Sequence, residues 1–334
     1  MKPSSPWRRV ANLAGRGFAL LAVIALTGWA VAALYFDLLS GGSLRTVGAS
    51  GYGVAMAGTL LAFRGRGKGI AICIAGFALV LAWWLSLKPS NDRNWQPDVA
   101  QTAWAEIDGD RVTIHNVRNC DYRTEGDYTP HWETRSYDLS QIRGMDIFLT
   151  YWGSPWIAHP IVSFQFGDND FVAISIETRK EVGEHYSAIR GFFRYYELIY
   201  TVSDERDVVR LRTNYRKGEE TYLYHTRATP LRARTTFMNY IKKINQIRNH
   251  PEWYNALTNN CTTNITRLAG EPEWDWRVLL NGHADRMLYD RGDLATGNLP
   301  FDQFKKQAHI NAAAKAADDA PDFSRRIREG RVGF

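Results

Sequence analysis

Residues 1–90 are far more apolar than the rest of this 334-residue chain, and that contrast limits what the chain can fold into. Residues 17–39 hold one acid, Asp37, and are long enough for a helix rising about 1.5 Å per residue to cross roughly 30 Å of hydrocarbon. Residues 69–87 are similarly apolar, and residues 47–63 are shorter and rich in glycine and alanine. Because more apolar sequence follows the first segment, it differs from a cleaved signal peptide. The pattern predicts three uncleaved transmembrane helices over these ranges.

Basic residues around the apolar segments set the expected orientation. They are Lys2, Arg8, Arg9 and Arg16 before the first segment, Arg45 after it, and Arg64, Arg66 and Lys68 before the third. Short loops rich in lysine and arginine stay on the cytoplasmic side of a membrane. Three spans then place the N-terminus inside and everything after Lys88 outside. We expect a multi-pass protein of the inner (cytoplasmic) membrane whose domain faces the periplasm or the cell exterior. If residues 47–63 fail to insert, two spans leave the domain in the cytoplasm.

Charge and cysteine content exclude several classes of protein. The formal net charge is +6, but no basic run is flanked by aromatic residues, so an anionic membrane surface fits better as a partner than nucleic acid does. Three cysteines, Cys73, Cys120 and Cys261, are too few for a disulfide framework. The close His and Cys spacing typical of a metal site does not occur in the sequence, so we expect no metal and no other cofactor.

From residue 91 onward the pattern is typical of short strands separated by turns. Strands are expected over residues 111–117, 161–166, 171–177, 208–212 and 221–225. Apolar residues at three- and four-residue intervals predict a helix over residues 231–248, and a second helix is expected over Cys261–Leu268, ending at Gly270. Strands that precede helices favour an α+β domain with an antiparallel sheet.

Three regions are expected along the chain. Residues 1–90 form the membrane anchor, and residues 91–290 form the domain outside the membrane. The Ala-rich and Arg-rich residues 291–334 are expected to be a C-terminal tail, helical at most and otherwise solvated.

The stretch YNALTNNCTTNI at residues 254–265 is the most informative in the chain. Asn259 and Asn260 are natural N-cap residues, which puts Cys261 in the first turn of a helix, where the helix dipole and free amides favour a thiolate. Cys261 is therefore a candidate nucleophile. Two structural alternatives stay open, a buried cysteine without chemistry and a disulfide with Cys120.

A cysteine nucleophile needs a base, and His159 is the best placed of the eight histidines. Glu177 ends the next expected strand and would orient the imidazole. If the two strands form a hairpin through Gly-Asp-Asn-Asp (167–170), pairing His159 with Glu177 requires the numbers of each residue pair to add to 336. The two side chains then share a face of the sheet. We also expect a His159 ring nitrogen within about 4 Å of the Cys261 sulfur. An isolated strand histidine is otherwise a structural residue.

Five stretches together resemble the Lnb N-terminal periplasmic domain family. They are NVRN (116–119), HPIVSF (159–164), SIETRK (175–180), GFFRYYELIY (191–200) and YNALTNNCTT (254–263). The resemblance spans most of residues 95–270. That family is similar to circularly permuted NlpC-type papain-like enzymes, in which a strand histidine precedes the helix-borne cysteine. The order His159, Glu177, Cys261 fits this arrangement, so the resemblance implies a permuted papain-like domain.

What the resemblance implies about activity is acyl transfer on a lipoprotein or phospholipid substrate. An acyl chain would move from the diacylglyceryl lipid of a lipoprotein to its N-terminal amine through an acyl-cysteine. In that scheme Cys261 is the nucleophile, His159 the base and Glu177 its orienting partner.

The same motifs carry further candidate residues for substrate binding. Arg118 and Arg179 match basic positions of the family and would either contact a substrate headgroup or form salt bridges within the fold. Tyr254 and Asn260 are two further candidates beside the cysteine. Cys120 departs from the family pattern, which leads us to expect an aromatic residue after NVRN.

Two other functions remain open at the level of sequence. The same triad with water as acceptor would give a cysteine peptidase or amidase acting on cell-wall peptide or lipid. A disulfide between Cys120 and Cys261 would instead leave a non-enzymatic, membrane-anchored interaction domain. The aromatic residues 147–157 either line an acyl groove or belong to the core.

Overall fold

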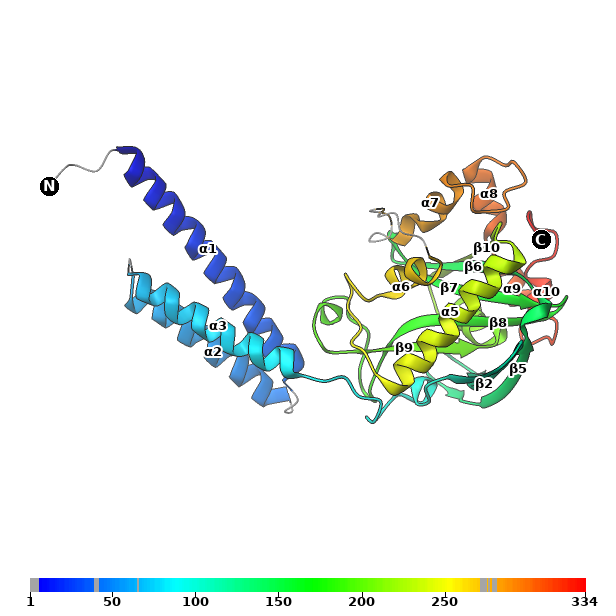
Figure 1. The fold of residues 1–334 in the computed structure, drawn as a ribbon, viewed down its shortest axis with the longest axis horizontal. Helices are drawn as coiled ribbons and strands as arrows, with labels where there is room; N and C mark the ends of the chain where they lie inside the picture. The colour runs from blue at the N-terminus through cyan, green and yellow to red at the C-terminus, as the bar shows by residue number, and fades with distance from the viewer. Residues whose placement is uncertain (1–5, 39–41, 65, 271–274, 276, 278–280) are drawn as a thin grey trace. The chain divides into compact units, whose positions relative to one another are not determined.

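The computed structural model describes residues 6–38, 42–64, 66–270, 275, 277 and 281–334, and its ribbon is shown in Figure 1. The chain divides into two compact units. One contains Met1–Pro89 together with Ser187–Tyr195, and the other contains Ser90–Tyr186 and Tyr196–Phe334.

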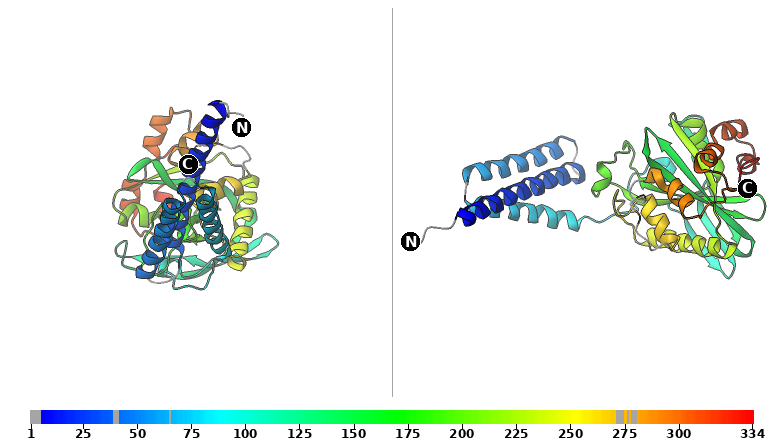
Figure 2. Two further views of the ribbon diagram at one scale, coloured as in Figure 1. Left: turned by 90° about the vertical axis from the view of Figure 1, so that its left-hand side faces the viewer. Right: turned by 90° about the horizontal axis from the view of Figure 1, so that it is seen from above.

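The first unit is built on three helices that lie side by side (Figure 2). They are α1 Pro6–Asp37, α2 Gly42–Ala62 and α3 Gly67–Ser86. Within the described residues, two helical segments are long and apolar enough to cross a membrane, Leu13–Asp37 of α1 and the whole of α3. Helix α2 does not meet the same criterion of length and hydropathy.

The packing of the three helices fixes their relative directions. Gly53 of α2 lies against Val31 of α1, and Gly48 lies against Leu38, so these two helices are antiparallel. A Cβ at Gly76 of α3 would lie 3.0 Å from the Met56 sulfur of α2, and only a glycine allows this close approach. The indole of Trp84 near the end of α3 donates a 2.6 Å hydrogen bond to Asp37 at the end of α1. Helices α1 and α3 therefore run in the same direction.

The loop Ser187–Tyr195 closes the C-terminal ends of α1 and α3 within this unit. Phe193 packs against the rings of Trp29 and Phe36. Arg194 donates hydrogen bonds to the carbonyls of Leu85 (3.0 Å) and Leu87 (2.7 Å). Since the last carbonyls of a helix lack partners within it and carry partial negative charge, a guanidinium stabilises this helix end.

The second unit is built on an eight-stranded sheet of order β1-β2-β9-β8-β7-β6-β10, with β5 paired to β2. Its strands are β1 Trp104–Asp108, β2 Arg111–Arg118, β5 Trp132–Asp138, β6 Ile142–Trp152, β7 Ser154–Phe166, β8 Asp170–Arg179, β9 Glu197–Ser203 and β10 Glu219–His225. The short strands β3 Asp121–Tyr122 and β4 Tyr128–Thr129 pair separately. All pairs are antiparallel except one parallel contact, Arg118 with Ser203, so the predicted α+β class is confirmed and the sheet is mixed.

Helices cover both faces of the sheet. One face carries α5 Pro230–Asn249, α6 Cys261–Leu268, α7 Ala284–Asp290 and α8 Phe301–Ala308. The other face carries α4 Glu205–Arg210, α9 Asn311–Ala317 and α10 Phe323–Arg326. Figure 1 shows α5 lying across the strands. The helices predicted over residues 231–248 and Cys261–Leu268 are confirmed as α5 and α6.

The strand predicted over residues 208–212 is wrong. These residues end α4 and begin a π-helical turn, Leu211–Tyr215. Asp204 caps α4 by accepting a hydrogen bond from the Arg206 amide. Val208 and Val209 are both buried in the core, which a helix lying on the sheet allows for consecutive residues. Tertiary packing therefore overrides the strand preference of these β-branched residues.

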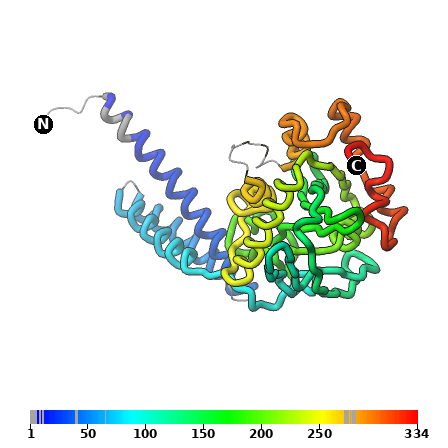
Figure 3. Tube along the Cα trace, turned by 45° about the vertical axis from the view of Figure 1, so that its right-hand side comes forward, coloured from blue at the N-terminus to red at the C-terminus, as the bar shows by residue number. Residues whose placement is uncertain are grey.

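The C-terminal residues are packed against the sheet, so the predicted solvated tail is also wrong. The C-terminal segment, coloured red in Figure 3, lies against the rest of the second unit. Ile310, Ala314, Phe323 and Ile327 are fully buried in one core cluster with Phe148 of β6. The alanines of this stretch are small enough for α9 to approach the sheet closely. The domain therefore continues to the end of the chain instead of stopping at residue 290.

Candidate active site

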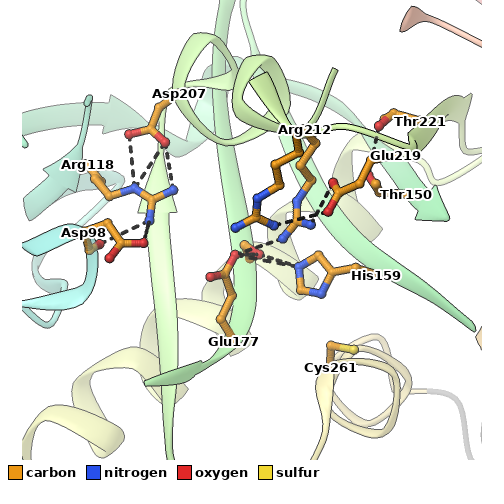
Figure 4. Close-up of polar contacts among 12 residues, drawn as sticks. Asp98, Arg118, Thr150, His159, Glu177, Asp207, Arg212, Glu219, Thr221 and Cys261 are labelled. Atoms are coloured by element: carbon orange, nitrogen blue, oxygen red, sulfur yellow. Dashed lines mark hydrogen bonds and ion pairs between the residues drawn. The ribbon is translucent and has the colours of Figure 1, made fainter. Parts of the chain in front are cut away.

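A cleft of about 680 Å³ lies where β7 and β8 stop pairing. Their pairing ends at Ile161 with Ser175, and the side chains beyond that pair line the cleft. His159 of β7, Glu177 of β8 and Cys261 of α6 all face into it. The three residues that the sequence singled out are thus brought to one cavity (Figure 4).

The predicted hairpin register is confirmed. The residue numbers of each β7–β8 pair, from Ile161 with Ser175 to Phe166 with Asp170, add to 336. His159 and Glu177 consequently lie on the same face, with 3.8 Å between Nε2 and the carboxylate Oε1. Gly-Asp-Asn-Asp forms the turn, with Gly167 in the left-handed region at φ +58°. The strand alternation therefore places the base and its partner together, as expected.

Ser175 joins these two residues and was missed by the sequence analysis. Its hydroxyl lies 2.7 Å from His159 Nε2 and donates a 2.7 Å hydrogen bond to Glu177. A hydroxyl has one proton to give, and an ionised carboxylate only accepts. Ser175 therefore accepts from an Nε2–H of His159, which leaves Nδ1 as the unprotonated nitrogen. Its signal in the sequence is that it lies two residues before Glu177, on the same strand face.

Two arginines of the π-helical turn set the electrostatics of the cleft. Arg212 is buried and contacts Glu177 (3.4 Å) and Glu219 (3.3 Å), and Arg216 contacts Glu219 (3.4 Å). Burial alone would raise the pKa of Glu177, but Arg212 and His159 outweigh it and hold this pKa well below its usual range. Burial, and to a smaller extent Arg212, lower the pKa of His159 to about 3. At neutral pH the site therefore contains a carboxylate and a neutral imidazole.

The helix start predicted at Cys261 is confirmed. Asn260 and Thr263 form a reciprocal capping box, and the Asn260 side chain accepts a 2.9 Å hydrogen bond from the Thr263 amide. The Asn281 amide lies 3.9 Å from the Cys261 sulfur and its oxygen accepts a 2.9 Å bond from the Ala158 amide. Asn281 thus ties the thiol to β7, and no pattern in the sequence points to it.

The thiol of Cys261 is free and uncharged at neutral pH. Burial raises its pKa, although Thr262 and the amides of the first helical turn act in the opposite direction. Cys120 is a separate free thiol, 3% exposed and packed with Tyr122 and Leu211. The alternative of a Cys120–Cys261 disulfide is therefore wrong, because neither sulfur is bridged.

His159 and Cys261 line the same cleft but come from opposite faces of the sheet. His159 shares its sheet face with Ile161, which packs under α4, whereas α6 covers the other face. The cleft is lined from both sides of the sheet. Among the described residues, no hydrogen bond joins the His159 ring to the thiol. In Figure 4 the ring lies between Glu177 and Cys261. The expected approach to within about 4 Å stays a prediction.

Of the four residues predicted to bind substrate, one lines the cleft and three make contacts within the fold. Tyr254 lines the cleft. Arg118 is buried in a bidentate salt bridge with Asp207, with distances of 2.7–3.1 Å (Figure 4), and Asn260 caps α6. Arg179 bonds the carbonyls of Val99 and Ala100. Of the two roles expected for these arginines, Arg118 has the salt bridge within the fold. Arg179 instead donates hydrogen bonds to backbone carbonyls.

The rate at which iodoacetamide alkylates Cys261 should report the protonation state of its thiol. Because its pKa is raised, the rate should climb about tenfold per pH unit from pH 6 to pH 8 and keep rising beyond pH 8.5, the ordinary thiol value. The rate is measured by peptide mass spectrometry on the full-length protein carrying Cys73→Ala and Cys120→Ala, with a free cysteine peptide as the control. A plateau below pH 7 would show a thiolate–imidazolium pair and contradict this assignment.

Comparison with known proteins yields one family. No group of three or more His, Cys, Asp or Glu side chains that would hold a metal occurs in the described part of the chain. No curated protein and no solved structure matches the sequence. Residues 128–282, which include His159, Glu177 and Cys261, match the model of the Lnb N-terminal periplasmic domain. The match agrees with the family resemblance of the sequence motifs, and together with the apolar helices α1 and α3 it indicates a membrane-anchored protein with a periplasmic domain.

Proposed function

We propose that this protein is a cysteine-dependent acyltransferase acting on lipid-linked substrates. The observation that carries the proposal is the convergence of a helix-capped cysteine with a His159–Ser175–Glu177 hydrogen-bond chain in one cleft. A nucleophile, a base and a group that orients the base are the parts that covalent acyl transfer needs. The match of residues 128–282 to the Lnb N-terminal periplasmic domain and the apolar helices α1 and α3 support a substrate that lies at a membrane surface.

The proposed first step forms an acyl-cysteine. His159 Nδ1 accepts the thiol proton as the Cys261 sulfur attacks the ester carbonyl carbon. The imidazolium then protonates the departing glycerol oxygen, which leaves a thioester on Cys261 and a lyso-lipid. Ser175 and the Glu177 carboxylate stabilise the transient imidazolium through the Nε2–H. Catalytic hydrogen bonds are often long before substrate binds, which fits the open approach of the ring to the thiol.

In the second step a lipoprotein N-terminal amine attacks the thioester carbonyl. The amine proton passes to His159 and then to the cysteine sulfur, so the free thiol and the neutral imidazole are restored. Water in place of the amine would give hydrolysis by the same residues.

The acceptor is tested by incubating the full-length protein in membranes with a diacylated lipopeptide. Mass spectrometry should find the acyl chain on the N-terminal amine. Free fatty acid alone would favour the hydrolase, and an unchanged lipopeptide would remove the proposal.

We further propose that all three helices of the anchor span the membrane. A periplasmic domain and a basic, cytoplasmic N-terminus require an odd number of spans. The parallel directions of α1 and α3 support this, because α2 must then return across the bilayer between them.

Reporter fusions should separate three spans from two. A phosphatase that is active only outside the cytoplasm should be active when fused after Phe334 and inactive when fused after Arg64, between α2 and α3. The fusion after Arg64 is the internal control for expression and membrane insertion. The reverse pattern would mean that α2 stays outside and that the domain is cytoplasmic.

A further inference from the structure

A second cavity, of about 110 Å³, lies between the sheet and helices α5, α6 and α7. Its floor is apolar and comes from alternate residues of two strands. These are Ile147 and Leu149 of β6 and Pro160 and Val162 of β7. Ile265 and Ala269 of α6 form the opposite wall. It is separate from the polar cleft that holds His159 and Glu177.

One end of this cavity adjoins the candidate nucleophile, because Thr262 follows Cys261 directly on α6 and lines the cavity. Pro160 lines it too, whereas its neighbour His159 points to the opposite face of the sheet and into the polar cleft. Ile265 lies one helical turn after Cys261 on the same side of α6. The cavity therefore runs along α6 from its first turn, beginning one residue from the candidate nucleophile.

Tyr240 provides a second, independent observation. Its side chain lines the cavity and is 0% exposed, yet its hydroxyl has no hydrogen-bond partner among the described residues. Buried hydroxyls are nearly always bonded, so an orphaned one indicates a group that is absent from the structure. The pKa of Tyr240 is raised by burial first and also by the neighbouring Tyr200 and Cys261, which places the phenol near the thiol.

We infer that this cavity holds the alkyl part of the acyl chain carried by Cys261, with the Tyr240 hydroxyl left free for the acyl carbonyl oxygen. This inference rests on the proposed acyl transfer, and it adds the binding site of the alkyl chain. A cavity of about 150 Å³ takes one benzene ring, so a cavity of about 110 Å³ holds roughly four carbon groups and takes the first part of an acyl chain. Such a cavity discriminates between chain lengths, since a single methylene in an apolar pocket is worth about tenfold or more.

The test attaches alkyl chains to Cys261 without any need for catalysis. Full-length protein carrying Cys73→Ala and Cys120→Ala is treated with methyl, butyl and octyl methanethiosulfonate, and labelling of Cys261 is followed by mass spectrometry. We expect the octyl reagent to label at least about tenfold faster than the methyl reagent, because its chain binds the cavity before the thiol reacts. Ala269→Phe, which fills the cavity, should remove that advantage.

Matched variants separate a filled cavity from a damaged fold. Ala313→Phe places the same ring on α9, over the other face of the sheet, and should keep the octyl advantage. Ala228→Phe fills the cavity from a loop and gives a second reading should Ala269→Phe unfold, as judged by its thermal transition. If the octyl advantage is missing in the parent, or survives in whichever cavity-filling variant folds, the inference is overturned. Failure of the lipopeptide assay alone would overturn acyl transfer and leave this result standing.

Discussion

Replacing Cys261 with alanine should abolish acyl transfer while leaving the protein folded and inserted in the membrane. Without a thiol, His159 and Glu177 have no covalent route, and loss of a nucleophile typically lowers the rate on the order of 10⁴-fold or more. Folding should change by less than about 1 kcal/mol, because alanine is a better helix former than cysteine and Asn260 still caps α6. The measurement is the amount of N-acylated lipopeptide formed by membranes that carry either form.

Cys120→Ala is the matched control for this experiment. Cys120 is also a buried free thiol, but it is not among the residues that line the cleft. Its removal should leave the transfer rate within about twofold of the parent. Transfer by the Cys261→Ala variant at the parent rate would show that Cys261 is not the nucleophile. Loss of transfer in both variants together with a lowered thermal transition would point to a folding defect.

Replacing Arg328 with methionine should cause the largest loss of stability among single substitutions of the C-terminal segment. Its guanidinium is buried between Asp146 (2.7 Å) and Glu205 (2.7 Å) and lies over the Phe171 ring. Removing it leaves the buried carboxylates of Asp146 and Glu205 without the guanidinium, with His225 and Ser163 as their remaining partners, which costs about 3–5 kcal/mol. For a domain of this size that should lower the thermal midpoint by roughly 6–20 °C, measured by near-ultraviolet circular dichroism of the full-length protein in detergent.

Two further variants show whether the buried charge is the cause. Arg325→Met, three residues earlier in α10, removes an arginine that is half-exposed and pairs with Asp322 and Glu329 at the surface, and should cost less than about 1 kcal/mol. Adding Glu205→Gln to Arg328→Met removes one of the uncompensated carboxylates and should restore part of the lost midpoint. An Arg328→Met midpoint equal to that of Arg325→Met would show that the C-terminal segment is not held by this ion pair.

Features set by neighbours along the chain were predictable from the sequence. The start of α6 follows from Asn260 and Cys261, because an N-cap acts within one helical turn. The hairpin register follows from the strict alternation of strand side chains, and it brings His159 and Glu177 to one face. The apolar segments predicted both ends of α3 and the end of α1 within two residues, since each helix must satisfy its own backbone in lipid, although α1 begins at Pro6, before its apolar part.

Features set by partners far along the chain were decided only by the tertiary structure. Residues 208–212 became a helix and a π-helical turn because the sheet face they cover buries consecutive side chains, and this change delivers Arg212 to Glu177. The C-terminal segment looks solvated until Arg328 meets Asp146, 182 positions away.

The relation of His159 to Cys261 is the clearest case of this division. The sequence by itself singled out these two residues as candidates for the chemistry and placed each on its own element. It did not determine that α6 covers the sheet face opposite to His159, with both residues lining one cleft where β7 and β8 stop pairing. Strand alternation and helix capping are local and are written in short motifs. The packing of a helix on a sheet depends on the sum of many weak, distant contacts, which no single motif encodes.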